Sequence, residues 1–150
     1  MEVTALFDHF TKLYRPYIKI AQPLLDKYEL HPAQWLILKD IYHHPQTTLV
    51  QISKRRSIEK PTTRKILKVL DERQWLVIQP GQDKREKLLT LSQEGEHIYH
   101  TLMADIRKEQ ATITATLDIT PDDLEQTIQL LDQLYKNMIA KIQCLESENK

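Results

Sequence analysis

The sequence has 150 residues, balanced charge (21 Lys+Arg against 21 Asp+Glu), two glycines and one cysteine. This length suits one domain with an added dimerisation segment, and the scarcity of glycine favours helices over a turn-rich β protein. A single Cys144 excludes an intrachain disulfide and a Cys-rich zinc site. No segment has the uncharged apolar length of a membrane span, and the N-terminus lacks the pattern of a signal peptide, so we expect a cytoplasmic protein.

The first predicted helix carries a long apolar stripe from Val3 to Tyr28, and Pro16 and Pro23 are expected to bend it or break it locally. The stripe is longer than one small core can cover, so we expect part of it to contact another chain. A second helix is predicted to begin at Pro32 and to end before Pro45.

Two short helices are predicted next. Thr48 and Gln51 have capping-box spacing and begin a helix through about Arg55, followed by a turn over residues 57–59. Pro61 suits the first turn of the following helix. Its apolar face comprises Thr63, Ile66, Leu67 and Leu70, and its other side carries Lys60, Pro61, Thr62, Arg64, Lys65 and Lys68. An apolar face for packing and a basic face left open are what a helix that reads DNA requires.

Two apolar runs follow, Leu76–Ile78 and Leu88–Leu91, and Pro80-Gly81 breaks the chain between them. They predict a β-hairpin with a charged tip over residues 81–87. This order of elements is the layout of a winged helix-turn-helix. From Lys54 to Lys87 there are 11 Lys+Arg against 5 Asp+Glu, a net charge of +6, so the rest of this neutral chain carries −6. Overall neutrality therefore does not argue against DNA binding, which depends on the local basic face.

The C-terminal part is predicted to form two more helices. Ser92 caps the first, which should end near Thr116, and Thr120-Pro121 begins the second. The last helix has a nearly heptad-spaced apolar stripe: Leu124, Ile128, Leu131, Leu134, Met138, Ile142 and Leu145. Such a stripe favours a partner helix, plausibly from a second subunit.

The chain resembles the MarR family of bacterial winged-helix regulators over essentially its whole length. The most specific match is the wing, Asp83-Lys84-Arg85-Glu86-Lys87 followed by Leu88-Leu89-Thr90-Leu91-Ser92, with Gly95 at the family's glycine. Residues 67–78 resemble the end of the family's recognition helix and the entry into the wing. Four departures stand out: Ser57 and Gln74 occupy positions where glycine is common, Arg56 sits where leucine is common, and Glu59 replaces a capping serine.

The resemblance implies a mainly α fold with a two- to three-stranded β-wing. It implies dimerisation helices over residues 1–30 and 116–150, a DNA-binding domain over 31–92, and a connecting helix over 93–115. The function it implies is a homodimeric transcriptional regulator that binds a pseudo-palindromic operator and acts as a repressor released by a small ligand. No catalysis and no cofactor are expected.

The site residues implied for DNA binding are Arg55, Arg56, Lys60, Pro61, Thr62, Arg64, Lys65, Lys68, Asp83, Arg85 and Lys87. Within this set, Arg85 is expected to enter a minor groove, with Asp83 pairing with it or with a nearby base. Arg64, Lys65, Thr62 and Lys60 are the candidates for the major groove. An effector pocket is implied at Tyr14, Tyr17, Tyr28, His31 and Trp35, although ordinary core packing explains each of these residues equally well.

Two other functions remain open. The first is a winged-helix module that binds a protein and not DNA. The second is a zinc-responsive regulator, suggested by His97 and His100, three apart on a predicted helix, and by His43-His44 near a loop. A zinc site needs at least three placed ligands, and no pattern joins these pairs. Lys141 is the one cation near Cys144 in the sequence, so a passive thiol is the default interpretation.

Overall fold

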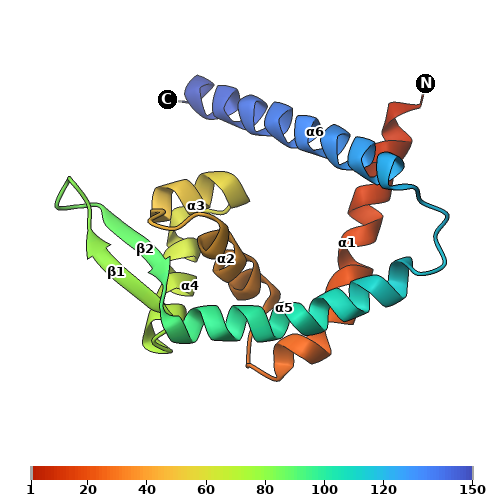
Figure 1. Cartoon of the computed structure of the whole chain (residues 1–150). Coiled ribbons are helices and arrows are strands. Elements are labelled where there is room, and N and C mark those ends of the chain that lie inside the picture. The colour runs from red at the N-terminus through yellow and green to blue at the C-terminus, as the bar shows by residue number, and fades with distance from the viewer. Residues whose placement is uncertain (1, 150) are drawn as a thin grey trace. The chain divides into compact units, whose positions relative to one another are not determined.

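A computed structural model describes residues 2–149, which form two compact units, residues 2–113 and 114–149. The first unit contains the helix-turn-helix, the wing and two longer helices (Figure 1). The elements are α1 (Val3–Asp26), α2 (Pro32–His43), α3 (Leu49–Arg56), α4 (Lys60–Glu72), β1 (Leu76–Pro80), β2 (Lys87–Leu91), α5 (Gln93–Thr114) and α6 (Pro121–Glu148). The predicted mainly α fold with a small wing is confirmed.

Two outcomes were expected at Pro16 and Pro23, a bend or a local break. Helix α1 is continuous through both prolines, so the local break is wrong. Each proline removes only one backbone donor, and the carbonyls that lose it belong to Lys12 and Lys19. Both prolines and both lysines are exposed, so water can solvate these carbonyls. The cost is small enough for the flanking turns to continue the helix.

Helices α2, α3 and α4 form the helix-turn-helix. The predicted capping box at the start of α3 is present, since Gln51 N donates to Thr48 Oγ1 (3.2 Å) and Thr48 N donates to Gln51 Oε1 (3.2 Å). Ser57 ends α3 with a left-handed backbone (φ 53°), the conformation for which glycine is favoured. The buried Ser53 hydroxyl then donates to Thr63 Oγ1 (2.9 Å), and this hydrogen bond ties α3 to α4.

The wing is an antiparallel pair in which Leu76 lies opposite Leu91 and Pro80 lies opposite Lys87. An isolated bridge adds Thr47, whose carbonyl accepts a hydrogen bond from Leu89 N (2.7 Å). The wing therefore has two strands, and this backbone hydrogen bond attaches β2 to the loop between α2 and α3.

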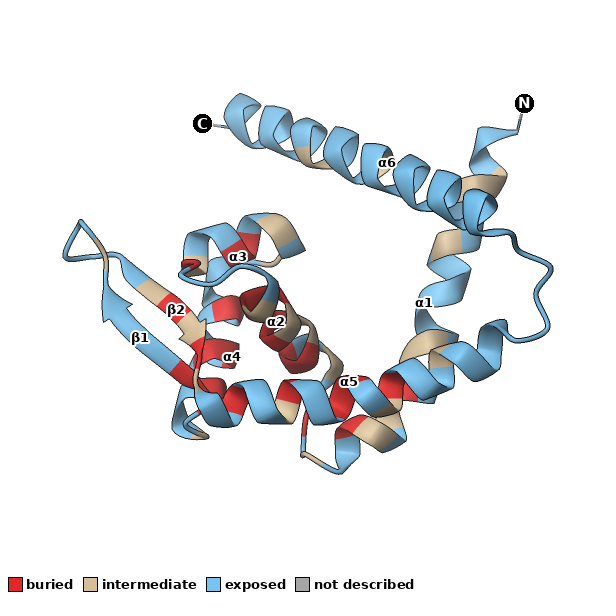
Figure 2. Cartoon of the chain, viewed as in Figure 1, coloured by how far each residue is buried: buried red, intermediate tan, exposed pale blue. Residues whose placement is uncertain are grey.

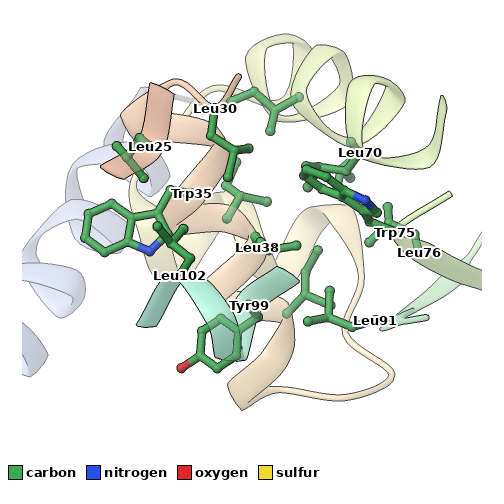
Figure 3. Packing of buried hydrophobic residues seen from close by; sticks show 14 of the residues in the cluster. Leu25, Leu30, Trp35, Leu38, Leu70, Trp75, Leu76, Leu91, Tyr99 and Leu102 are labelled. Carbon is green, nitrogen blue, oxygen red and sulfur yellow. The ribbon is translucent and has the colours of Figure 1, made fainter. Parts of the chain in front are cut away.

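The core of the first unit lies where its helices meet the base of the wing (Figures 2 and 3). Trp35, Leu38, Tyr99 and Leu102 are fully buried there, and α1 contributes Leu25. Each of the four predicted apolar residues of α4 is also buried, as the helical spacing required.

The start of α5 packs closely on the start of the wing. Ser92 Oγ accepts from Gly95 N (3.1 Å), which confirms the predicted cap, and Ser92 N donates to the Trp75 carbonyl oxygen (2.9 Å). At Gly95 a Cβ atom would lie 2.2 Å from that same oxygen, so only glycine fits. The helix ends at Thr114, two residues before the predicted Thr116, where Leu117 N closes a turn onto the Thr114 carbonyl (3.1 Å).

Helix α6 makes up most of the second unit. It begins as predicted, with a capping box between Thr120 and Asp123 and with Pro121 in its first turn. None of its described residues is buried, and Leu124, Ile128 and Leu145 are 47–57% exposed. Among residues 2–149, no helix combines the length and the apolar character that crossing a membrane requires.

Candidate nucleic-acid interface

One side of α4 presents cations to solvent. All six residues predicted for this face are exposed: Lys60, Pro61, Thr62, Arg64, Lys65 and Lys68. The orientation follows from the opposite face, which buries Ile66, Leu67 and Leu70 in the core. The helix is thus held by its apolar residues, and its cations remain available to a partner.

A hollow of about 1000 Å³ lies between α3, α4 and the wing. It brings six of the predicted DNA-binding residues together: Lys60, Arg64, Lys68, Asp83, Arg85 and Lys87. Its lining also has an apolar part, which includes Leu49, Leu67, Ile78 and Leu89. Five cations against three acids (Asp71, Asp83 and Glu86) give the lining a net positive charge, which suits an anionic partner.

The wing tip is shaped by its own backbone. Asp83 Oδ1 accepts a hydrogen bond from Arg85 N (3.1 Å), and the Asp83 carbonyl accepts from Glu86 N (2.9 Å). The carboxylate therefore stabilises the turn and does not pair with the Arg85 guanidinium. Arg85 is exposed and makes no ion pair with any described residue.

Arg55 differs from the other ten residues predicted to contact DNA. Those ten are exposed, whereas the Arg55 side chain is 25% exposed and pairs with the buried carboxylate of Asp40. Its Nε donates to Asp40 Oδ1 (3.1 Å) and its Nη2 to Asp40 Oδ2 (2.8 Å). Sequence reasoning missed Asp40, although an acid between the apolar Leu38 and Ile41 of α2 signals a buried partner.

The residues proposed for an effector pocket are only partly brought together. The rings of Tyr17 and Trp35 lie 6.2 Å apart, and Tyr17 Oη accepts a hydrogen bond from Gln110 (3.0 Å). Tyr14 is exposed on α1, Tyr28 is half-buried, and His31 is the exposed N-cap of α2. Of the five residues, the structure thus brings the rings of Tyr17 and Trp35 together, and within residues 2–149 no ring contact includes the other three.

The surroundings of Trp35 are polar in two respects. Its buried Nε1 has no hydrogen-bond partner among the described residues. The Lys39 ammonium lies 5.9 Å from the centre of its ring, and burial, with Arg107 and Arg56 nearby, lowers the pKa of Lys39. A cation in this environment favours an anionic neighbour.

Two of the candidate zinc ligands, His43 and His100, join an aromatic cluster. Tyr42 stacks on Tyr99 at 4.0 Å, His100 lies edge-on to both rings, and His43 Nε2 is 3.4 Å from Tyr99 Oη. Burial raises the pKa of the Tyr99 hydroxyl. Within residues 2–149, no group of three or more His, Cys, Asp or Glu side chains is arranged to hold a metal ion.

These features define a DNA-binding winged helix-turn-helix protein. The MarR family model matches residues 30–87. An HTH-type transcriptional regulator of Staphylococcus aureus (strain MSSA476) is 42% identical over 136 residues, 90% of this chain and 93% of the relative. YwoH, an HTH-type regulator of Bacillus subtilis (strain 168), is 30% identical over 107 residues, 71% of this chain and 77% of the relative. The chain belongs to the MarR family of transcriptional regulators.

Solved structures agree with this assignment. A native S. aureus MarR is 39% identical and superposes with a TM-score of 0.85, covering 93% of this chain and 99% of that one. An S. aureus MarR in complex with salicylate and kanamycin is also 39% identical, with a TM-score of 0.80 over 92% of this chain and 93% of that one. A Listeria monocytogenes MarR family regulator complexed with a 26mer DNA has a TM-score of 0.83 over 96% and 95% of the chains. At 15% identity, it supports the fold alone.

Proposed function

We propose that this regulator is a homodimeric repressor that binds a pseudo-palindromic operator and is released by a small ligand. The observation that carries the proposal is the hollow between α3, α4 and the wing. Its lining has a net positive charge and includes cations of both α4 and the wing. A protein that acts on the chromosome of a bacterium works in the cytoplasm, and we expect this one to do so.

In this proposal α4 enters the major groove. Arg64 and Lys65 are assigned to base edges, because Arg and Lys pair with the acceptors of guanine, and the Thr62 methyl is assigned to thymine. Lys60 and Lys68, with Arg56 and Lys87, are assigned to phosphates. Arg85, exposed at the wing tip, is assigned to a minor groove, where a narrow A·T-rich segment attracts cations.

The dimer is proposed from apolar surface that the described chain leaves exposed. Helix α6 carries Ile128 at 57% exposure, and α1 carries Leu13 at 64%. Stripes of this length on two terminal helices favour packing around a two-fold axis, which would set two α4 helices on one duplex. Light scattering should give about twice 17.8 kDa at micromolar concentration. A stable monomer would contradict this part of the proposal.

The DNA-binding part is tested by fluorescence anisotropy with a duplex taken from upstream of the protein's own gene and with a scrambled duplex. We expect preference for the first, and a fall in affinity of about 0.9 log units per log unit of salt for each phosphate neutralised. Arg64→Ala and Lys65→Ala should each weaken cognate binding by about 1–3 kcal/mol and relax preference at one or two base pairs. Arg85→Ala should weaken binding to both duplexes.

Three results would change the assignments. Equal losses on both duplexes for Arg64→Ala and Lys65→Ala would make these residues phosphate contacts. Unfolding of either variant would mean that α4 is rotated from its assigned orientation. Salt-insensitive binding, or no DNA binding, would favour the protein-binding module.

The effector is proposed to bind beside Tyr17 and Trp35, where the Lys39 ammonium supplies a positive charge. Salicylate is the first compound to test, because the S. aureus MarR at 39% identity was solved with it. Titration of salicylate into the protein–duplex complex should lower the anisotropy, and Lys39→Met should require more salicylate for the same effect. A complex that is unchanged at saturating salicylate would remove this class of effector.

A further inference from the structure

A buried ion pair connects α2 with α3. The carboxylate of Asp40, 7% exposed, accepts two charge-assisted hydrogen bonds from the guanidinium of Arg55, through Nε (3.1 Å) and Nη2 (2.8 Å). This two-point geometry fixes the direction of the Arg55 side chain as well as its distance. His44 also faces Asp40, with Nδ1 3.8 Å from the carboxylate and 2.9 Å from the backbone carbonyl of the same residue.

The ion pair extends to the wing through Thr47. The Nη2 of Arg55 also donates to Thr47 Oγ1, and this hydroxyl donates in turn to Gln51 Oε1 (3.0 Å). The carbonyl of Thr47 accepts from Leu89 N in the middle of β2 (2.7 Å). Next to it, Gln46 N donates to Thr90 Oγ1 (3.1 Å). The Arg55 guanidinium therefore links α2 and α3 to the loop between them, and this loop is hydrogen-bonded to β2 of the wing.

The link lies away from the base of the wing. At the base, Leu76 and Leu91 pack in the core and Ser92 N donates to the Trp75 carbonyl, whereas the hydrogen bonds to Thr47 and Gln46 hold β2 further toward the tip, at Leu89 and Thr90. Thr47 is 2% exposed, so its polar atoms need the partners they have. If Arg55 is removed, the buried Asp40 carboxylate loses its guanidinium partner and keeps, among the described residues, only His44, 3.8 Å away, while Thr47 loses the donor that connects the loop to the ion pair.

We propose that Arg55, Asp40 and Thr47 are positioning residues for DNA binding, and that they set the separation between α4 and the wing rather than contact DNA. The inference rests on the proposed function, because α4 and the wing must engage the same duplex at the same time. Asp40 is the decisive residue, since an acid near a phosphate contact opposes DNA binding, whereas an acid that positions the wing supports it.

The first test measures amide hydrogen exchange by NMR on the free protein. Arg55→Gln should speed exchange of the Leu89 amide by on the order of tenfold relative to the Leu102 amide, which reports opening of the core. Arg56→Gln is the matched control, since it removes the same charge from the adjacent exposed position. It should leave both amides unchanged. A loss of overall stability alone would speed both amides together and would overturn the proposal.

The second test measures DNA affinity at fixed salt. Asp40→Asn makes the protein more positive, so a model in which Arg55 binds phosphate requires equal or tighter binding. The positioning model requires weaker binding, by on the order of tenfold. The double variant Asp40→Asn/Arg55→Gln should lose about as much affinity as either single variant, because both break the same link.

Thr47→Val covers the case in which Asp40→Asn fails to fold. It keeps every charge and the backbone bridge to Leu89 but removes the hydroxyl that accepts from Arg55, and it should also speed Leu89 exchange and weaken DNA binding. Unchanged Leu89 exchange in Arg55→Gln, or undiminished DNA affinity in Asp40→Asn, would overturn the inference. Failure of the wild-type protein to bind any duplex would instead refute the proposed function, while the exchange experiment would still test the link.

Discussion

Replacing Gly95 with alanine should disrupt the packing of α5 against the start of the wing and lower the free energy of unfolding. The added Cβ would lie 2.2 Å from the Trp75 carbonyl oxygen and 3.0 Å from its carbonyl carbon, and both belong to backbone that cannot rotate away. The same oxygen accepts from Ser92 N (2.9 Å), and Ser92 Oγ donates to the Gln74 carbonyl (2.7 Å). A shift large enough to relieve the contact would therefore break two hydrogen bonds.

The magnitude follows from these contacts. Overpacking costs about 1–3 kcal/mol. Two lost hydrogen bonds cost about 1 kcal/mol each. Alanine regains up to about 1 kcal/mol of helix propensity in the first turn of α5. The net loss in the free energy of unfolding is about 2–4 kcal/mol, a large share of the roughly 5–15 kcal/mol typical of a native protein.

Urea denaturation followed by circular dichroism, at one protein concentration, measures this loss. Gly81→Ala is the matched control, because the atoms nearest to its added Cβ belong to the exposed side chain of Glu86 and not to backbone: Oε2 at 2.8 Å and Cβ and Cγ at 3.0 Å. We expect the control to change the free energy of unfolding by less than about 0.5 kcal/mol. Wild-type stability in Gly95→Ala, or an equal loss in Gly81→Ala, would refute the reasoning.

Three further variants test other contacts. Gln74→Gly should stabilise the protein slightly, by up to about 1 kcal/mol, since Gln74 has a left-handed backbone (φ 65°) that glycine adopts without strain; a lower Tm would contradict this. Arg73→Met should lower the Tm, because the guanidinium donates to the carbonyls of Tyr28 (2.9 Å) and Glu29 (2.6 Å) and so connects the end of α4 to the turn that follows α1. An unchanged Tm would show that these two hydrogen bonds do not stabilise the protein. Lys39→Met should raise the Tm at pH 7, where burial and two arginines disfavour the charge, and this gain should shrink as the pH approaches 10.

The positions that contradicted simple sequence rules are also informative. Pro16 and Pro23 were expected to bend α1 or to break it locally, yet the helix continues, because the carbonyls that lose a donor belong to exposed residues. Ser57 and Gln74, which stand where glycine is common, both adopt the left-handed backbone that glycine favours. The backbone at these two positions is therefore the one that suits glycine even though the residues differ.

Local rules were sufficient for the elements and for the exposed cations. The caps at Thr48 and Thr120 and the periodicity of α4 predicted where helices begin and which face is buried, because these depend on residues within one or two turns. Exposure of Arg64 and Lys65 followed from the same periodicity.

The partners of Arg55 were decided only by the tertiary structure. The sequence places Arg55 beside Arg56 in a basic run, where both are equally suited to bind phosphate. Folding brings Asp40, 15 residues earlier, into an ion pair with Arg55, while Arg56 stays exposed. It also brings Leu89 into a backbone hydrogen bond with Thr47. Contacts between distant segments depend on how whole helices pack, and the chemistry of neighbouring residues does not encode this packing. For that reason the sequence determined where the cations lie, and only the fold decided which of them is held inside the protein.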